Sequence, residues 1–102
     1  MAIQKVTVNG KFKLGQLVMT AAVNNKVADD TPFSKFVISS LGRHAAGDWG
    51  DMAQEDKAEN NLAVSEGNLR VFSAYEKEGL PKIWIITEAD RSVTTVLFPE
   101  DY

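Results

Sequence analysis

The feature that most constrains this sequence is a change in the spacing of its apolar residues near Gly67. Between Thr31 and this glycine, apolar side chains recur every three or four residues, which is the spacing of helices with one buried face. After it, apolar and polar side chains alternate, which is the spacing of β-strands. Helices followed by consecutive strands predict an α+β domain in which the helices pack on the sheet.

Three strands are expected in the last third of the chain. They span Leu69–Tyr75, Lys82–Glu88 and Ser92–Phe98, and Pro99 ends the last one. The links between them are short enough for hairpins. The predicted sheet is therefore a C-terminal three-stranded antiparallel meander.

The helix with the clearest pattern is expected to begin at Thr31, as its N-cap, with Pro32 in the first turn. A proline is tolerated there because its missing N–H would have no partner in the helix. Gly47 is expected to end it. Its predicted buried face carries Phe33, Phe36, Val37, Leu41 and His44.

The N-terminal part predicts a possible hairpin and one helix. Ile3–Val8 is rich in β-branched residues, Asn9-Gly10 is a typical two-residue turn, and Lys11–Leu14 is a candidate returning strand. The apolar residues from Leu17 to Ala22 then predict a helix that ends somewhere in residues 24–30.

A third, more polar helix is expected between the clear helix and the strands. Asp48 or Asp51 is its predicted N-cap, and Gly67 is its predicted end. Its apolar stripe, which includes Leu62, is thin, so the helix should lie on the surface. Trp49 is expected to anchor the preceding turn in the core.

The chain of 102 residues, 44% of them apolar, fits a single domain spanning 1–102. It contains no cysteine, which excludes disulfides and thiolate metal sites. Neither a signal-peptide pattern nor a run of roughly 18 apolar residues is present, so we expect a soluble cytoplasmic protein without a membrane segment. A domain of this size leaves little room for a large cofactor, and none is predicted.

The net charge of −3 is unevenly distributed and disfavours direct nucleic-acid binding. Between positions 44 and 66, a single base, Lys57, stands against six acids: Asp48, Asp51, Glu55, Asp56, Glu59 and Glu66. Such a segment predicts either an acidic binding surface or a solvated helix face, because acids are also favoured in the first turn of a helix. Carboxylates can hold a hard cation, but their spacing here fits no calcium loop, and no metal site is predicted.

His44 is the only histidine and the first candidate for proton transfer near neutral pH. A histidine near a helix C-terminus is also typical of a partly buried structural cap. Small α+β ribonuclease toxins combine a histidine, an arginine and hydroxyl groups, for which His44, Arg91, Thr94 and Tyr75 are the candidates here. The acidic balance speaks against this ribonuclease hypothesis, because such enzymes need a basic face for RNA.

The sequence also resembles a known family at four places. They are Lys82–Tyr102, Asp48-Trp49-Gly50-Asp51, Glu55-Asp56-Lys57 and Ser73-Ala74-Tyr75. These segments are similar to a family of small proteins of phages, plasmids and integrative elements, and the similarity runs from about Phe12 to the end. Some members carry the name of a type I restriction methyltransferase subunit. This chain lacks the repeated βαβ units and the glycine-rich loop that such a methyltransferase needs.

The resemblance implies a role in a mobile genetic element and no catalytic residues. A small acidic protein of this origin suggests an inhibitor of a host defence enzyme, of the anti-restriction or anti-CRISPR kind. Its acidic segment would imitate the phosphate charges that such a nuclease binds. The expected partner is therefore a protein, the oligomeric state is left open, and an accessory role without inhibition is an alternative. The predicted partner-binding residues are Asp48, Trp49, Asp51, Glu55, Asp56 and Glu59.

Overall fold

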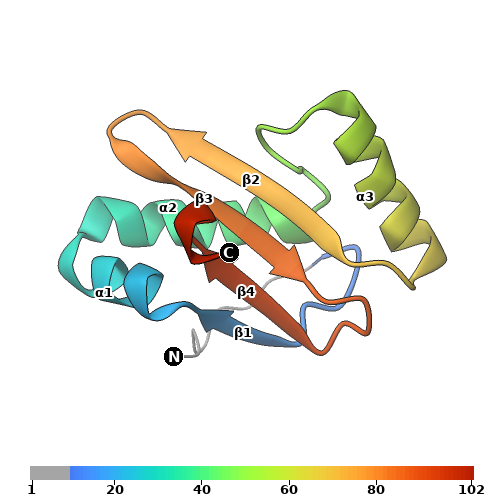
Figure 1. Ribbon diagram of the computed structural model, residues 1–102, viewed down its shortest axis with the longest axis horizontal. Coiled ribbons are helices and arrows are strands. Elements are labelled where there is room, and N and C mark those ends of the chain that lie inside the picture. Colours follow the sequence, from blue (N-terminus) through green and yellow to red (C-terminus); the bar gives the residue numbers. More distant parts are fainter. Residues whose placement is uncertain (1–9) are drawn as a thin grey trace.

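The structure is a computed structural model that describes residues 10–102. In this part of the chain the elements are, in order, β1 (Gln16–Met19), α1 (Ala21–Asp29), α2 (Thr31–Ala45), α3 (Gln54–Glu66), β2 (Val71–Lys77), β3 (Leu80–Thr87), β4 (Val93–Leu97) and the 3-10 helix η1 (Pro99–Asp101). Helix α2 lies behind the sheet, α1 lies at the end of the sheet next to β1, α3 lies beside β2, and η1 lies in front of the sheet (Figure 1). No helix of the described residues is long and apolar enough to cross a membrane.

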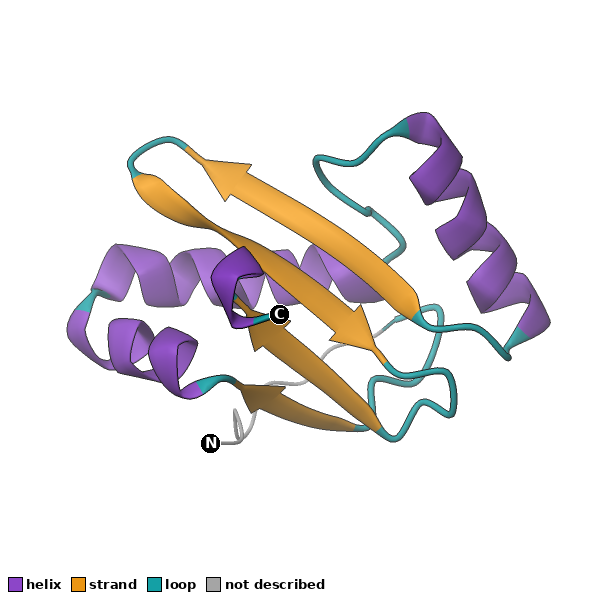
Figure 2. Cartoon of the chain, viewed as in Figure 1, coloured by secondary structure: helices purple, strands orange, loops and turns teal. Residues whose placement is uncertain are grey.

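The sheet has the strand order β1-β4-β3-β2 (Figure 2). β2, β3 and β4 pair antiparallel with their neighbours in sequence, as the short links predict. β1 adds a fourth strand, parallel to β4, with Gln16 opposite Val93 and Met19 opposite Val96. The α+β class is confirmed, but the prediction of a three-stranded antiparallel meander is wrong, because the sheet is mixed.

The predictions for the N-terminal part need correction. Leu17 and Val18 lie in β1 and not in a helix. The helix starts only at Ala21, and Thr20 is its N-cap, because the Thr20 side chain accepts a hydrogen bond from the backbone N–H of Val23. The proposed strand Lys11–Leu14 is a loop. The proposed strand at residues 3–8 and the first residue of its turn lie outside the described residues.

Helix α2 has the predicted buried face, and all five of its predicted residues are buried. Its N-cap is Asp30, one residue earlier than expected, because the Asp30 carboxylate accepts a hydrogen bond of 3.0 Å from the backbone N–H of Phe33. The helix ends at Ala45, and Gly47 follows with φ of 85°. The sequence pattern therefore located this helix to within two residues at each end.

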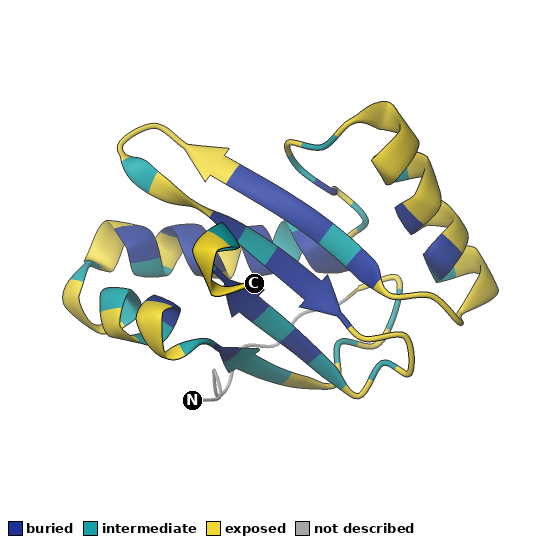
Figure 3. Cartoon of the chain, in the orientation of Figure 1, coloured by how far each residue is buried: buried dark blue, intermediate teal, exposed yellow. Residues whose placement is uncertain are grey.

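The main core lies between α1, α2 and the inner face of the sheet, which we define as the face turned towards α2. It joins Phe33, Phe36 and Leu41 of α2 to Tyr75, Ile83 and Ile85 of β2 and β3. A smaller core of Trp49, Ala63 and Val71 lies beneath α3. Most of α3 is exposed (Figure 3), so the predicted surface position of this helix is confirmed.

Helix α3 begins later than predicted and ends where predicted. Its N-cap is Ala53, which has no side-chain hydrogen bond, and neither Asp48 nor Asp51 caps it. Gly67 closes the helix with φ of 74°, a left-handed conformation that glycine adopts readily.

The free edge of β2 is closed by side chains and by the loop before α3. The Asn60 amide donates to the carbonyl of Phe72 (2.6 Å) and accepts from the N–H of the same residue (3.1 Å). Further along, the N–H of Ala74 donates to the carbonyl of Trp49, and the carbonyl of Ala74 accepts from the N–H of Asp51. These bonds occupy backbone groups that an edge strand otherwise leaves open.

Candidate functional site

His44 is fully buried between α2 and the inner face of the sheet. Its Nδ1 is hydrogen-bonded to the hydroxyl of Ser73, and its Nε2 lies 2.9 Å from the hydroxyl of Thr87. Burial, and to a smaller extent the positive charge of Arg91, lowers the pKa of His44 to about 3. The imidazole is therefore neutral at physiological pH.

The hydroxyl groups around His44 form one directed chain of hydrogen bonds. Thr94 donates to the carbonyl of Leu14 (2.7 Å), so its single proton is spent and it must accept from Thr87, which lies 2.7 Å away. Thr87 then has no proton left for His44 and accepts from Nε2–H. The remaining nitrogen, Nδ1, accepts from Ser73. The chain thus assigns the Nε2–H tautomer to His44.

Arg91 fastens three segments together. Its guanidinium donates to the carbonyls of Leu69 (2.7 Å), Ala63 (2.9 Å), Glu88 (3.1 Å) and Ala89 (3.3 Å). These carbonyls belong to α3, to the loop before β2 and to the turn after β3. All four of its hydrogen bonds go to backbone oxygens, which is the pattern of a structural tie.

The other two residues of the ribonuclease hypothesis are also committed to the fold. Thr94 is fully buried. Tyr75 is fully buried too, donates its hydroxyl to the carbonyl of Asp48 (2.7 Å), and has its pKa raised, chiefly by burial. His44 and Arg91 both contact the Phe12 ring, at 5.4 Å and 5.6 Å from its centroid. The four residues form no accessible group for substrate.

The predicted acidic segment divides into two groups with different environments. Asp48 belongs to the first group: its carboxylate receives two hydrogen bonds from the guanidinium of Arg43, at 2.7 Å and 3.2 Å, and its pKa is lowered by that contact. Asp51 also holds the loop, because its carboxylate accepts from the N–H of Glu76 on β2 (2.9 Å). Between them, Gly50 has φ of 76° and lies so close to β2 that a Cβ would collide with the carbonyl of Ala74.

Trp49 does not offer its ring to a partner. It is 3% exposed, its Nε1–H donates to Asn61 of α3 (2.9 Å), and its ring packs beside Phe12. The expectation that Trp49 anchors the turn in the core is confirmed. Its inclusion among the partner-binding residues therefore finds no support in its position.

The second acidic group projects from α3 into solvent. Glu55, Asp56 and Glu59 are exposed, and none of them forms an ion pair or a side-chain hydrogen bond within residues 10–102. Residues 55, 59, 62 and 66 are spaced three or four apart, so Leu62 lies within the same stripe as three glutamates. Contrary to the sequence prediction, Leu62 faces solvent and is 52% exposed.

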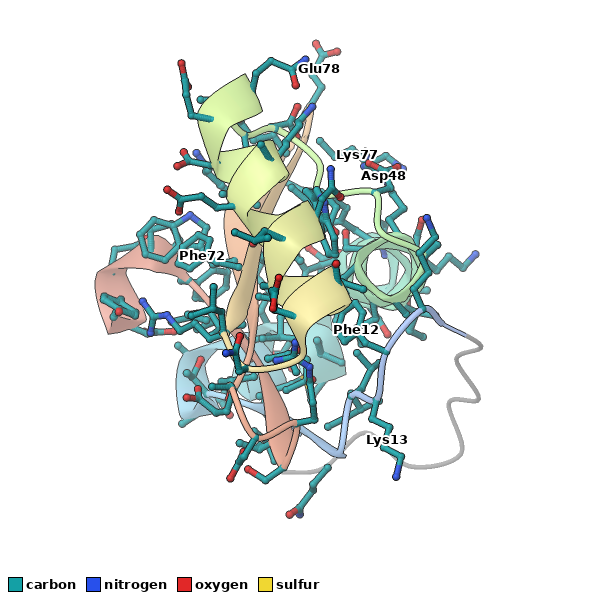
Figure 4. The ribbon with its side chains drawn as sticks, turned by 90° about the vertical axis from the view of Figure 1, so that its right-hand side faces the viewer. Phe12, Lys13, Asp48, Phe72, Lys77 and Glu78 are labelled. Carbon is teal, nitrogen blue, oxygen red and sulfur yellow. The ribbon has the colours of Figure 1, made fainter. Side chains whose placement is uncertain are left out.

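The sequence pattern did not predict a groove of about 640 Å³ between α3 and the start of β2. It is lined by Met52, Asp56, Glu59, Asn60, Leu62, Leu69, Arg70 and Phe72. Figure 4 looks onto α3 and shows Phe72 on one side of the helix and Asp48 on the other. The available signal was the pair Leu62 and Leu69, two leucines on either side of the predicted helix end at Gly67.

A row of aromatic rings continues from the groove across the outer face of the sheet. The rings of Phe72 and Trp84 lie 4.9 Å apart, and those of Trp84 and Tyr102 lie 5.8 Å apart. Arg70 donates to the hydroxyl of Tyr102 (2.8 Å) and stands over the same ring. Groove and row together form one mixed surface on the side opposite α2.

Within residues 10–102, no three histidine, aspartate or glutamate side chains are grouped so that they could hold a metal ion. Comparison with protein-family models, curated proteins and solved structures finds no match to this chain. The functional interpretation therefore depends on the positions and charges of the side chains.

Proposed function

We propose that this chain is a non-catalytic, cytoplasmic binding protein of a mobile genetic element, which inhibits a host nuclease of a restriction or CRISPR defence system. The exposed acids of α3 occupy the partner's basic nucleic-acid-binding surface and so exclude its substrate. Asp48 and Asp51 serve this surface indirectly, because they hold the loop that leads into α3.

The observation that supports this proposal most is the division of the acidic segment. Glu55, Asp56 and Glu59 are exposed without ion-pair partners in the described part of the chain. Their helix is held to the rest of the fold by hydrogen bonds at Asn60, Asn61 and Ala63. A fixed helix presents its charges without a loss of backbone conformational freedom on binding. Like charges at this spacing repel one another, and this offsets the stabilisation that acids give in the first turn of a helix.

The competing ribonuclease hypothesis gains no such support. Its histidine, tyrosine and threonine are each fully buried and hydrogen-bonded, and its arginine is engaged by backbone carbonyls. A general base must come within hydrogen-bond reach of the proton that it removes. In this arrangement the imidazole has no free nitrogen for a substrate.

The test compares three tagged proteins as baits in host lysate and as inhibitors of the recovered nuclease. These are the wild type, the variant Glu55→Gln/Asp56→Asn/Glu59→Gln, and the control Asp29→Asn/Glu78→Gln/Glu88→Gln, which removes three exposed acids elsewhere. We expect wild type and control to recover a nuclease subunit in near-equal amount and to block its cleavage of DNA or RNA, and the α3 variant to do neither. Full inhibition by the α3 variant would contradict the proposal.

A further inference from the structure

The groove beside α3 concentrates the exposed apolar side chains of the described residues. Among residues 10–102, four large apolar side chains are exposed. Leu62, Leu69 and Tyr102 lie on the groove or on its aromatic row, and Ile38 lies on α2. Gathered exposed apolar side chains are typical of a binding surface, whereas isolated ones are ordinary. The groove therefore has the character of a docking site.

The charge on the wall of the groove selects the kind of partner. Asp56 and Glu59 line it from α3, and Glu55 and Glu66 extend the same stripe along the helix. The cation of the lining, Arg70, lies against the Tyr102 ring and donates to its hydroxyl. A segment that fills the groove with apolar side chains therefore meets carboxylates along the α3 side, which favours lysine or arginine on that flank.

The closed edge of β2 selects the shape of the partner. A peptide that binds as an added strand needs free N–H and C=O groups on an edge. At Phe72 both groups are bonded to Asn60, and at Ala74 both are bonded to the loop. Recognition here must use side chains, as it does when an amphipathic helix lies in a groove. Helix α3, with 13 residues, is about 20 Å long and gives such a helix three turns or more of contact.

We propose that the groove between α3 and β2 binds a basic amphipathic helix of the partner protein. The apolar face of that helix packs on Leu62, Leu69 and Phe72, and its lysine or arginine side chains pair with Asp56 and Glu59. This inference rests on the proposed function, since it names the element of the nuclease that the acidic surface binds.

The direct test uses peptides of about 18 residues as probes, so it does not depend on identification of the nuclease. One peptide combines leucines on one helical face with lysines on the other; a second has the same composition in scrambled order; a third replaces lysine by glutamate. The isotope-labelled protein is titrated with each and followed by NMR. We expect the first peptide alone to shift the amide signals of Asn60, Leu69 and Phe72. Equal binding of the scrambled or acidic peptide would overturn the proposal.

Substitution of exposed residues locates the binding without endangering the fold. We expect Leu62→Ser/Leu69→Ser to lower the affinity for the first peptide, with leucines and lysines on opposite faces, by about tenfold or more. The matched control is Ile38→Ser, because Ile38 and Leu69 are both 47% exposed; it should bind like the wild type. Unchanged binding by the double variant would overturn the inference. So would the same signal shifts in concentrated protein without peptide, since the occupant would then be a second copy of the chain.

The inhibition assay separates this inference from the function on which it rests. If the double leucine variant loses the peptide but still inhibits the nuclease, the acidic surface acts without the groove, and only the groove proposal fails. If the wild type inhibits no nuclease while its groove binds the basic helix, the proposed function fails and the docking site stands. If the double variant loses both peptide binding and nuclease inhibition while Ile38→Ser retains both, the groove proposal and the proposed function are supported together.

Discussion

His44 shows how one buried residue has its tautomer determined by the far end of a hydrogen-bond chain. The carbonyl of Leu14 can only accept, and this orders the protons of Thr94, Thr87 and His44 in turn. The sequence pattern placed His44 correctly on the buried face of its helix. It could not show the hydroxyl partners, because Ser73 and Thr87 are 29 and 43 residues away along the chain.

The burial of His44 predicts that acid destabilises the fold. Its pKa is about 3 when folded and near 6.5 when unfolded, so the unfolded chain takes up a proton that the folded chain refuses. Stability from this group is therefore complete above pH 6.5 and is lost as the pH falls towards 3. We expect a loss of about 2.5 kcal/mol between about pH 7.5 and 4.5, measured by urea unfolding.

The variant His44→Gln is the control for this titration. It is expected to be less stable than the wild type at neutral pH, because it disturbs a packed site. Its free energy of unfolding should nevertheless vary much less over the same pH range. A slope equal to that of the wild type would assign the acid sensitivity to other groups.

Arg91 provides the second prediction at the residue scale. Lysine would keep the charge but could not hold four carbonyls in the planar arrangement that the guanidinium provides. We expect Arg91→Lys to lower the free energy of unfolding by about 2 kcal/mol. Chemical denaturation measures this, with Arg70→Lys as a control, since Arg70 is exposed and, within residues 10–102, bonds only Tyr102. Equal stability of the two variants would contradict the assigned role of Arg91.

At the scale of elements, the sequence predicted what local patterns determine. Helix α2 and strands β2, β3 and β4 carry strong periodicity and were located closely. The sequence predicts a helix at the position of β1 because a strand of four residues has almost no pattern of its own, and its form depends on pairing with β4. Capping is a local rule, so the sequence predicts the aspartates before α3 as caps. Asp48 instead bonds Arg43, five residues earlier in the chain, and Asp51 bonds the backbone of Glu76, a partner that only the tertiary fold brings close.

The pairing of α3 with β2 predicts a strong effect at Asn60. Asn60→Ala leaves the N–H and C=O of Phe72 without their partners, and we expect a loss of about 2 kcal/mol. Asn60→Asp keeps the acceptor but places a carboxylate oxygen against the carbonyl of Phe72, so it should not restore the stability. Thermal unfolding with Ser65→Ala, an exposed α3 residue, as the control checks both. If Asn60→Asp were as stable as the wild type, the role assigned to the two hydrogen bonds between Asn60 and Phe72 would be contradicted.

For the molecule as a whole, the acids of α3 are expected to matter for binding and not for stability. Neutralising Glu55, Asp56 and Glu59 removes mutual repulsion but also removes favourable charges from the first turn of the helix. These effects are each a few tenths of a kcal/mol and oppose one another, so the midpoint of thermal unfolding should change by about 2 °C or less. A large loss of stability in calorimetry would assign these acids a structural role.

The candidate site illustrates the limit of sequence reasoning at this scale. The sequence shows the acidic segment but not its separation into structural and exposed acids. Asp48 and Glu59 are both carboxylates, and only their neighbours in the fold distinguish their roles. Leu62 and Leu69 line the same groove only because α3 packs beside β2. Charge composition is visible in a sequence, whereas concavity is not.

The closed edge of β2 also has a consequence for the chain while it folds. β2 and β3 bring together Phe72, Ile83, Trp84, Ile85 and Ile86, a composition typical of segments that assemble into cross-β fibrils. Until α3 is in place, the backbone of Phe72 is a template on which another copy of the strand can grow. The amide of Asn60 removes that template, so the packing of α3 on β2 also protects the folded chain from fibril growth at this edge.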